Sequence, residues 1–436
     1  MSTDEQGLQQ RLAASALSPT EPLVNTAASR KKRVLIICQA SLETVAMLSR
    51  ILNEISVLEG SEEVQLHVAW LLDWSYRRDP TSRRWAESVR SEWGCPQAIF
   101  YSLPLLGKGS IGRYASAAVR LVLLAAYLRS RRIEVVQVHS FYGVQGAVLR
   151  LKKFLGFRCV LDMQGAYPEE VAYLGGTNGT VENLHARERE ALQDCDSILC
   201  VSQNMVRHLV QKHHAATEKF RVLPCCVPRA NVGADPERRR LARERLKLDG
   251  KFVLAYAGGT GSWQCVPEIC DLFARVAERW PEAALLVFSW GDLDLVRRCL
   301  NRFGIDPNLC VLKRLDQSEV HEYLVAGDVG LLLREDQLLN HVSSPTKFAE
   351  YLAAGLPVIT TPHAGDAAEI VVRNGIGTVV DLPPATDVQA LMSFLGRVRS
   401  SREELARKCL SYVEDQLVWE GRKAQLLDAV TCFPTR

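Results

Sequence analysis

Lys347 and Glu350 lie three residues apart in the segment 343–359, which reads SSPTKFAEYLAAGLPVI, and both could contact one ligand. Ser344 is a favourable N-cap and Pro345 suits the first helical position, so the sequence predicts that a helix begins here. The free N–H groups at a helix start favour an anion, and Lys347 would add a full positive charge. Glu350 could accept hydrogen bonds from two neighbouring hydroxyls. A phosphate and a neighbouring diol occur together in a sugar nucleotide.

A second interpretation of this segment needs no ligand. Lys347 and Glu350 could form an ion pair on the surface of a capped helix, and such a pair contributes only a few tenths of a kcal/mol. The two interpretations predict different surroundings for Lys347, because an ordinary surface pair keeps its ammonium group in water.

Short apolar segments alternate with helical patterns along the chain, which is typical of parallel sheets covered by helices on both faces. The alternation predicts two doubly wound, Rossmann-like α/β domains that face each other across a cleft. Ligands of such sheets bind at the carboxyl ends of the strands. The expected strands are 33–40, 64–72, 98–103, 134–140, 157–165, 197–202 and 220–227 in the first half, and 251–259, 284–291, 310–315, 329–333, 357–362 and 377–382 in the second.

The chain divides into four predicted regions. Residues 1–30 are polar and lack the apolar core of a secretory signal, which predicts a disordered tail. The two α/β domains are expected at 31–227 and 228–410. Residues 411–436 contain an amphipathic helical pattern with no strand after it, and we expect this helix to cross back onto the first domain.

Composition limits the class of protein. The 436 residues carry a net charge of only +3, and 24% of them are charged, which is typical of a soluble globular protein and argues against a nucleic-acid partner. The 13 cysteines are scattered without zinc-site spacing, so reduced thiols and a cytoplasmic location are expected. No apolar run is long enough to span a bilayer.

With its motifs in view, the chain resembles the GT-B glycosyltransferases, and within them the retaining family 4, also called glycosyl transferases group 1. The resemblance covers most of the chain from residue 33 onward. It rests on the helix segment SPTKFAEYLAAGLPVI and on four shorter motifs: AYAGGTGSWQ (255–264), AGDVGLLLRE (326–335), GDAAEIV (365–371) and DMQGAYPEE (162–170).

The resemblance implies roles for residues of the second domain, which would bind the donor. Glu350 would bind the donor ribose, and Lys347 would lie near the diphosphate. Arg334 is a candidate second cation, although it could instead pair with Glu335 or Asp336. The donor would further be contacted by backbone and side-chain groups at Gly258, Gly259, Ser343 and Ser344.

One position departs from the family pattern. Relatives commonly carry a second glutamate eight residues before the first, and Val342 stands there in this chain. Asn340 or Ser343 could replace the hydrogen bonds that this glutamate makes near the transferred sugar.

The first domain would bind the acceptor. Gln164 occupies a loop position where relatives often carry a histidine, so Asp162 and Gln164 are candidates for acceptor contact. Asp162 could instead only anchor its loop. His139 ends the strand 134–140, where functional side chains gather in α/β sheets, but a single histidine there could equally be structural.

These features predict a metal-independent, hexosyltransferase-like retaining enzyme without a cofactor. It would transfer sugar from a nucleoside-diphosphate sugar to a glycan or lipid-linked acceptor in polysaccharide biosynthesis. The alternatives are a sugar-nucleotide epimerase of the same fold and a non-catalytic sugar-nucleotide-binding subunit. Asp292 and Asp294 form an Asp-x-Asp pair that could hold a metal ion, but an acidic helix start explains them better.

A peripheral membrane contact is expected through residues 108–132, on the cytoplasmic face. This stretch holds six cations and no acid: Lys108, Arg113, Arg120, Arg129, Arg131 and Arg132. The apolar run LVLLAAYL lies between Arg120 and Arg129. The alternative is a buried helix of the sheet with its arginines solvated at both ends.

Overall fold

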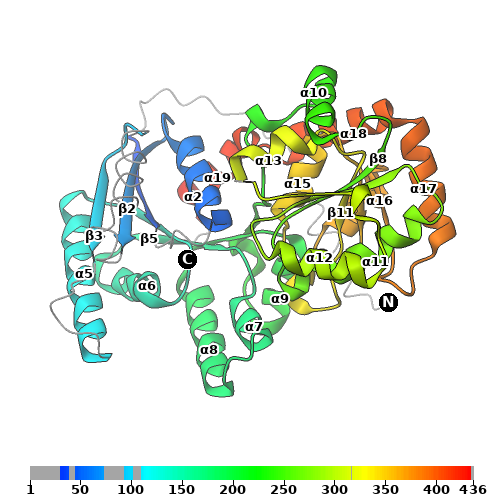
Figure 1. The fold of residues 1–436 in the computed structure, drawn as a ribbon. Coiled ribbons are helices and arrows are strands. Elements are labelled where there is room, and N and C mark those ends of the chain that lie inside the picture. The colour runs from blue at the N-terminus through cyan, green and yellow to red at the C-terminus, as the bar shows by residue number, and fades with distance from the viewer. Residues whose placement is uncertain (1–29, 39–44, 73–92, 102–109, 316, 434–436) are drawn as a thin grey trace, which may run out of the picture. The chain divides into compact units, whose positions relative to one another are not determined.

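The computed structural model describes residues 30–38, 45–72, 93–101, 110–315 and 317–433, and Lys32–Arg436 form one compact unit (Figure 1). The predicted tail 1–30 lies outside the described residues, except for Arg30. Two parallel sheets organise the compact unit, one for each half of the chain. This confirms the predicted two Rossmann-like halves.

The first sheet has seven strands in the order β3-β2-β1-β4-β5-β6-β7, and every neighbouring pair is parallel. Its strands are β1 (Lys32–Cys38), β2 (Val64–Leu72), β3 (Gln97–Tyr101), β4 (Val135–Val138), β5 (Arg158–Met163), β6 (Ser197–Cys200) and β7 (Phe220–Val222). Its helices are α2 (Val45–Leu58), α5 (Ser110–Ser130), α6 (Gly143–Leu155), α7 (Tyr167–Tyr173), α8 (Asn178–Asp194), α9 (Gln203–His213) and the short η2 (Thr217–Lys219).

The second sheet has six parallel strands in the order β10-β9-β8-β11-β12-β13. Its strands are β8 (Phe252–Ala257), β9 (Ala283–Phe288), β10 (Cys310–Lys313), β11 (Val329–Leu332), β12 (Val358–Thr360) and β13 (Gly377–Val379). The helices of this half are η3 (Arg229–Asn231), α10 (Pro236–Leu246), η4 (Ser262–Gln264), α11 (Val266–Ala277), α12 (Leu293–Arg302), η5 (Pro307–Leu309), α13 (Gln317–Leu324), α14 (Leu338–His341), α15 (Thr346–Ala353), α16 (Ala367–Asn374), α17 (Val388–Ser400) and α18 (Arg402–Gln416).

Each sheet buries both of its faces, which explains why its strands are continuous apolar runs. Alternate residues of β1 point to opposite cores: Leu35 and Ile37 join one cluster, and Val34 and Ile36 join the other. The strand β8 divides its side chains between two cores in the same way. The sheets therefore hold their carboxyl ends, where the candidate residues lie, on a rigid frame.

The C-terminal segment crosses back onto the first half, as predicted, but it is not one helix. The helix α18 packs against α15 and α17 of the second half. After it, Leu417 and Trp419 exchange backbone hydrogen bonds with Val227, and then come η6 (Trp419–Arg422) and α19 (Lys423–Thr431). The helix α19 packs on α2 and β6 (Figure 1). The predicted continuous helical pattern over 411–430 is thus wrong at residues 417–422, where the chain passes from one half to the other.

Within the described residues, no helix has both the length and the apolar character needed to cross a bilayer.

Candidate functional site

Lys347 lies on the first turn of α15 with its ammonium group under the end of strand β8. Its Nζ donates a hydrogen bond to Oε1 of Gln264 at 2.7 Å and lies 4.2 Å from the centre of the Tyr256 ring. The residue is only 8% exposed, which excludes the alternative of an exposed surface pair with Glu350. Burial, and then the charge of Arg334, hold the pKa of Lys347 well below its usual range, while Glu350 raises it.

Gly258 follows β8 and passes directly over this ammonium group. A Cβ built on Gly258 would lie 2.3 Å from Nζ of Lys347, so no larger residue fits without displacing the lysine. A Cβ on Gly259 would make only an ordinary contact, with Trp290 at 3.8 Å. The backbone is therefore tightly packed against Lys347 at Gly258 and not at Gly259, and the approach of both glycines to a donor phosphate stays a prediction.

Arg334 follows strand β11 and is 4% exposed. Its Nη1 donates to the carbonyl oxygen of Leu333 at 2.9 Å. No carboxylate of the described residues forms an ion pair with it: the Glu335 carboxylate accepts from the Tyr173 hydroxyl at 2.5 Å, and Asp336 contacts two histidines. The predicted alternative, a pair with Glu335 or Asp336, is therefore wrong. Burial lowers the pKa of the Arg334 guanidinium.

Two buried cations thus lie near each other at the carboxyl ends of β8 and β11. Desolvation makes such a pair unfavourable unless an anion compensates for it. The half-buried Glu350 lies one turn further along α15, on the same side as Lys347. This arrangement can bind a multiply charged anion and a hydroxyl-bearing group beside it.

The start of α15 differs from the prediction by one residue. Pro345 is the N-cap and the helix begins at Thr346. Ser344 does not cap its own helix, because its Oγ accepts a hydrogen bond from the backbone N–H of Cys225, in the first half, at 3.0 Å. The Ser344 hydroxyl therefore connects the two halves.

Ser343, Asn340 and Val342 also have structural partners. The backbone N–H and the hydroxyl of Ser343 both donate to the Asn340 carbonyl oxygen, and Nδ2 of Asn340 donates to the Glu335 carbonyl oxygen. Val342 is buried in the core of the first half, and its carbonyl oxygen accepts from the Ser202 hydroxyl at 2.7 Å. Position 342 therefore packs the two halves together, and the backbone N–H that Ser343 was predicted to offer a diphosphate already has an acceptor.

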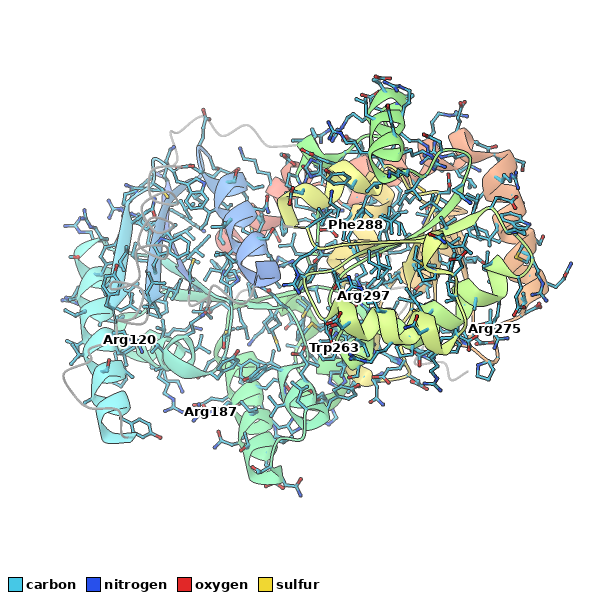
Figure 2. The ribbon with its side chains drawn as sticks, in the orientation of Figure 1. Arg120, Arg187, Trp263, Arg275, Phe288 and Arg297 are labelled. Carbon is cyan, nitrogen blue, oxygen red and sulfur yellow. The ribbon has the colours of Figure 1, made fainter. Side chains whose placement is uncertain are left out.

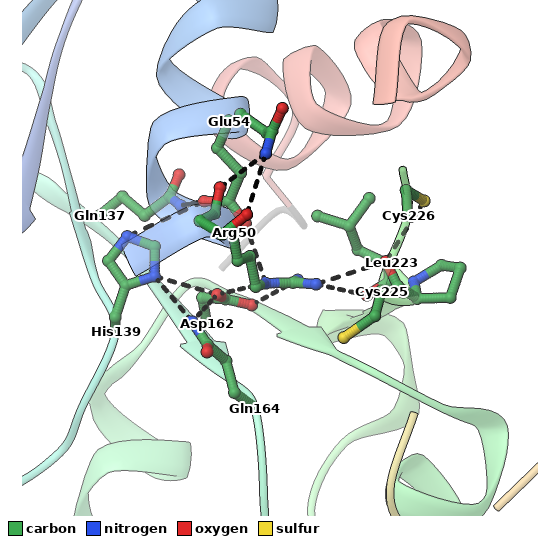
Figure 3. A network of polar contacts seen from close by, with 12 residues as sticks. Arg50, Glu54, Gln137, His139, Asp162, Gln164, Leu223, Cys225 and Cys226 are labelled. Atoms are coloured by element: carbon green, nitrogen blue, oxygen red, sulfur yellow. Dashed lines mark hydrogen bonds and ion pairs between the residues drawn. The ribbon is translucent and has the colours of Figure 1, made fainter. Parts of the chain in front are cut away.

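Asp162 is the centre of a buried polar network in the first half (Figure 3). Its carboxylate accepts two hydrogen bonds from the Arg50 guanidinium, at 2.8 and 2.9 Å. Nδ1 of His139 lies 3.0 Å from Oδ2 of Asp162, and Nε2 of Gln164 donates to the same oxygen at 3.0 Å. The side chains of Asp162 and His139 are fully buried, whereas Gln164 is partly exposed. Gln164 is thus the member of this group that solvent can reach, and contacts with the other two position its side chain.

Two members of this network, Arg50 and Glu54 on α2, were not predicted from the sequence. Glu54 lies 3.0 Å from Nε of Arg50, and its other oxygen accepts a hydrogen bond from Gln137 at 2.7 Å. The two residues are spaced i,i+4 within an otherwise apolar helical pattern, and that was the signal available: charges on the buried face of a helix need partners.

Asp292 and Asp294 both have partners at the start of α12. Asp292 is the N-cap and accepts from the backbone N–H groups of Asp294 and Leu295, and its other oxygen contacts Arg298 at 3.2 Å. Asp294 pairs with Arg297 at 2.6 Å. The predicted acidic helix start is confirmed at this position.

Hydrogen bonds hold the carboxyl ends of the two sheets together. The Asp366 carboxylate, in the second half, accepts from the backbone N–H groups of Gln203 and Asn204 at the start of α9, at 2.7 and 3.2 Å. The Tyr173 hydroxyl of the first half contacts Ser262 and Glu335 of the second, and its ring lies 6.4 Å from that of Trp263. Residues of the two halves are therefore in direct contact at the carboxyl ends of the sheets.

Residues 56–226 match the family described as glycosyl transferase 4-like domain, and residues 251–415 match glycosyl transferases group 1. The chain belongs to the GT-B glycosyltransferases. No curated protein matches this glycosyltransferase in sequence.

Solved structures share the fold of this glycosyltransferase at low sequence identity. HepE from Anabaena, in complex with UDP, is 12% identical, with a TM-score of 0.68 over 92% of this chain and 99% of that chain. A glycosyltransferase from Rickettsia africae is 14% identical, with a TM-score of 0.67 over 92% and 100%. WaaG, a glycosyltransferase involved in lipopolysaccharide biosynthesis, is 15% identical, with a TM-score of 0.63 over 92% and 100%.

The buried network predicts an unusual pH dependence of stability for the glycosyltransferase. Burial and the nearby Asp162 raise the pKa of the Glu54 carboxyl to about 7, despite the opposing effects of Arg50, His139 and Gln137. The folded chain therefore holds this proton at a pH where the unfolded chain has lost it. The resulting stabilisation is full below the ordinary pKa of glutamate and is lost as the pH rises through about 7.

We expect the free energy of unfolding of the wild type to fall by roughly 2–3 kcal/mol more between pH 5 and pH 8 than that of Glu54→Gln, measured by urea denaturation. Glu169→Gln is the matched control, because the pKa of Glu169 is lowered to about 2 and lies outside this window. Parallel pH profiles for wild type and Glu54→Gln would contradict the prediction.

Proposed function

We propose that the protein transfers a sugar from a nucleoside-diphosphate sugar to a glycan or lipid-linked acceptor, with retention of anomeric configuration. The observation that carries the proposal is that Lys347 and Arg334 are both buried basic residues. Among the described residues, no carboxylate forms an ion pair with Arg334. A diphosphate would supply the missing negative charge. Glu350 would accept hydrogen bonds from the donor ribose.

Sugar transfer requires that the diphosphate leaving group be stabilised. As the bond to the anomeric carbon breaks, negative charge grows on the diphosphate, and Lys347, Arg334 and the start of α15 would stabilise it electrostatically. The acceptor hydroxyl would attack from the face that the diphosphate leaves, with Gln164 near the acceptor. HepE has been solved with UDP and with UDP-glucose, which supports a nucleotide-sugar donor here.

The proposal is tested with purified protein and a panel of nucleoside diphosphates and nucleotide sugars. A ligand that binds only the folded state raises the melting temperature by mass action, so the panel identifies the donor. Incubation of that donor with and without acceptors then separates the alternatives. Transfer, or slow release of free sugar, supports a transferase; conversion of the donor to another nucleotide sugar indicates an epimerase; binding with no product indicates a non-catalytic subunit.

Transfer is expected to proceed without a divalent metal, because two protein cations are available for the diphosphate. The rate in excess chelator should stay within about twofold of the untreated rate, a difference of less than half a kcal/mol in the barrier. A rate that disappears in chelator and returns with magnesium or manganese would contradict this prediction. Asp292→Asn would then test whether the Asp-x-Asp pair holds the ion.

We also propose that α5 contacts an anionic membrane surface, which would place the enzyme in the cytoplasm beside a lipid-linked acceptor. Only Leu124 and Leu128 of the run LVLLAAYL are buried, while Val122 and Leu123 are 68% and 52% exposed. This exposure does not fit a helix buried on all sides. Arg120 lies on the same helix (Figure 2), and Arg129, Arg131 and Arg132 are at or just beyond its end, whereas Lys108 and the Arg113 side chain lie outside the description.

Co-sedimentation with vesicles tests the contact. Binding should need anionic lipid and fall with salt, and changing Arg129, Arg131 and Arg132 to serine should weaken it by about 100-fold, since each basic residue contributes about 1 kcal/mol near such a surface. The matched control changes three exposed arginines of α12, Arg297, Arg298 and Arg302, to serine and should bind like wild type. Equal recovery with neutral and anionic vesicles, or none with either, would contradict the proposal.

A further inference from the structure

Asp336, His341 and His363 bring three metal-binding side chains together at the surface of the second half. Nε2 of His341 lies 2.8 Å from Oδ1 of Asp336, and Nδ1 of His363 lies 3.6 Å from the same oxygen. All three ligand atoms lie within 4.8 Å of one another. The two imidazole rings are 5.0 Å apart, with an angle of 31° between their planes. The positions 336, 341 and 363 form no compact motif, which is why the sequence predicted no metal site.

We propose that these three residues bind a first-row divalent metal ion of the zinc type. Two imidazoles and one carboxylate are a donor set that zinc prefers, and bonds of 2.0–2.1 Å in tetrahedral geometry separate neighbouring ligand atoms by about 3.3 Å. The observed separations of 2.8 and 3.6 Å lie on either side of that value. Asp336 is 76% and His341 is 41% exposed in the side chain, so water can occupy the fourth position.

A hydrogen bond accounts for only one of the two contacts between a histidine and Asp336. His341 and Asp336 form an ordinary hydrogen bond, but 3.6 Å is too long for one between His363 and Asp336. A metal ion would engage all three groups. Glu335 is not available as a further ligand through the oxygen that accepts from Tyr173.

The backbone holds the three residues in place from separate elements. Asp336 follows β11, His341 ends α14, and His363 follows β12. The Thr361 hydroxyl donates to the Arg334 carbonyl oxygen at 2.7 Å and accepts from the Arg334 N–H at 3.0 Å, so the loops after β11 and β12 are tied together.

Gly365 reinforces this arrangement. It has a φ of +60°, and a Cβ there would lie 2.0 Å from the Ser343 carbonyl oxygen, so the loop that carries His363 packs directly on the loop that follows His341. The ligands are therefore largely preorganised, which lowers the conformational cost of binding an ion.

The test is calorimetric titration of the full chain with zinc chloride at pH 7.5, in a Cys432→Ser background. All 13 cysteines lie in the described residues: Cys432 is exposed, Cys95, Cys225 and Cys310 are partly buried, and the other nine are buried, so this change removes the most accessible thiol. We expect one zinc ion per chain. His341→Gln and His363→Gln should each weaken binding about tenfold or more, which corresponds to about 1.4 kcal/mol.

The matched control is His214→Asn, which removes an exposed histidine in another part of the chain. Asparagine is a suitable replacement because it tolerates the φ of +50° that the backbone has there. It should bind zinc like the background protein, and zinc should raise the melting temperature of both but not of the double variant His341→Gln/His363→Gln. Two results would overturn the inference: no zinc binding by the background protein, or undiminished binding by the double variant. Neither depends on sugar transfer, so failure of this inference and failure of the proposed function remain distinguishable.

Discussion

Lys347→Met is expected to lower kcat/KM for sugar transfer by about 100-fold or more, the effect typical of losing one preorganised electrostatic group at a developing charge. Methionine keeps the length and apolar stem of the side chain and removes only the cation. Because the lysine is 8% exposed and its pKa is held low by burial, its replacement should leave the free energy of unfolding unchanged or raise it. Loss of activity with retained stability would locate the defect in the reaction.

The matched control is Lys313→Met. Lys313 also lies over a tyrosine ring, that of Tyr323 at 4.1 Å, in the same half of the chain but away from α15. Its replacement should leave transfer within about twofold. Wild-type turnover by Lys347→Met, or an equal loss in both variants, would contradict the assignment of Lys347.

Glu350→Ala separates the two parts of the donor site. This variant should weaken binding of the nucleoside and of its diphosphate to a similar degree, because the lost hydrogen bonds go to the ribose that both ligands contain. Lys347→Met should weaken only the diphosphate. The melting-temperature shift given by each ligand measures both effects, and identical ligand profiles for the two variants would contradict the division of roles.

Trp419→Ala is expected to lower the free energy of unfolding by about 3–5 kcal/mol, the usual cost of truncating a buried tryptophan. Trp419 is 3% exposed and lies in the core of the first half although the chain reaches it from the second. The Arg50 guanidinium lies 5.5 Å from the centre of its ring. The variant therefore removes core packing and one contact of the buried network at the same point.

Urea denaturation measures this loss, and Trp290→Ala is the matched control. Trp290 is 59% exposed, so its truncation should change stability by about 0.5 kcal/mol or less. A change of similar size in both variants would show that the crossing segment contributes little to the stability of the first half.

The sequence by itself determined the class of fold. Apolar runs and helical periodicity located the 13 strands of the described residues, each end to within five residues, because parallel strands buried on both faces carry their signal locally. Gly156 ends α6 in the left-handed conformation, which glycine adopts without steric cost. The helix that carries Lys347 and Glu350 was also predicted to within one residue of its observed start, since the start of a short helix is read from adjacent residues.

Only the tertiary structure decided which side chains share a site. Asp162 and Arg50 are 112 residues apart in the chain, and His363 lies 22 positions beyond His341. Local sequence patterns therefore cannot predict that the members of either pair come together. The same reason explains the error at Ser344, whose hydroxyl has its partner, the backbone N–H of Cys225, in the first half. Helix and strand preferences are set by near neighbours, whereas the partner of a buried charge is set by the order in which the sheet places its strands.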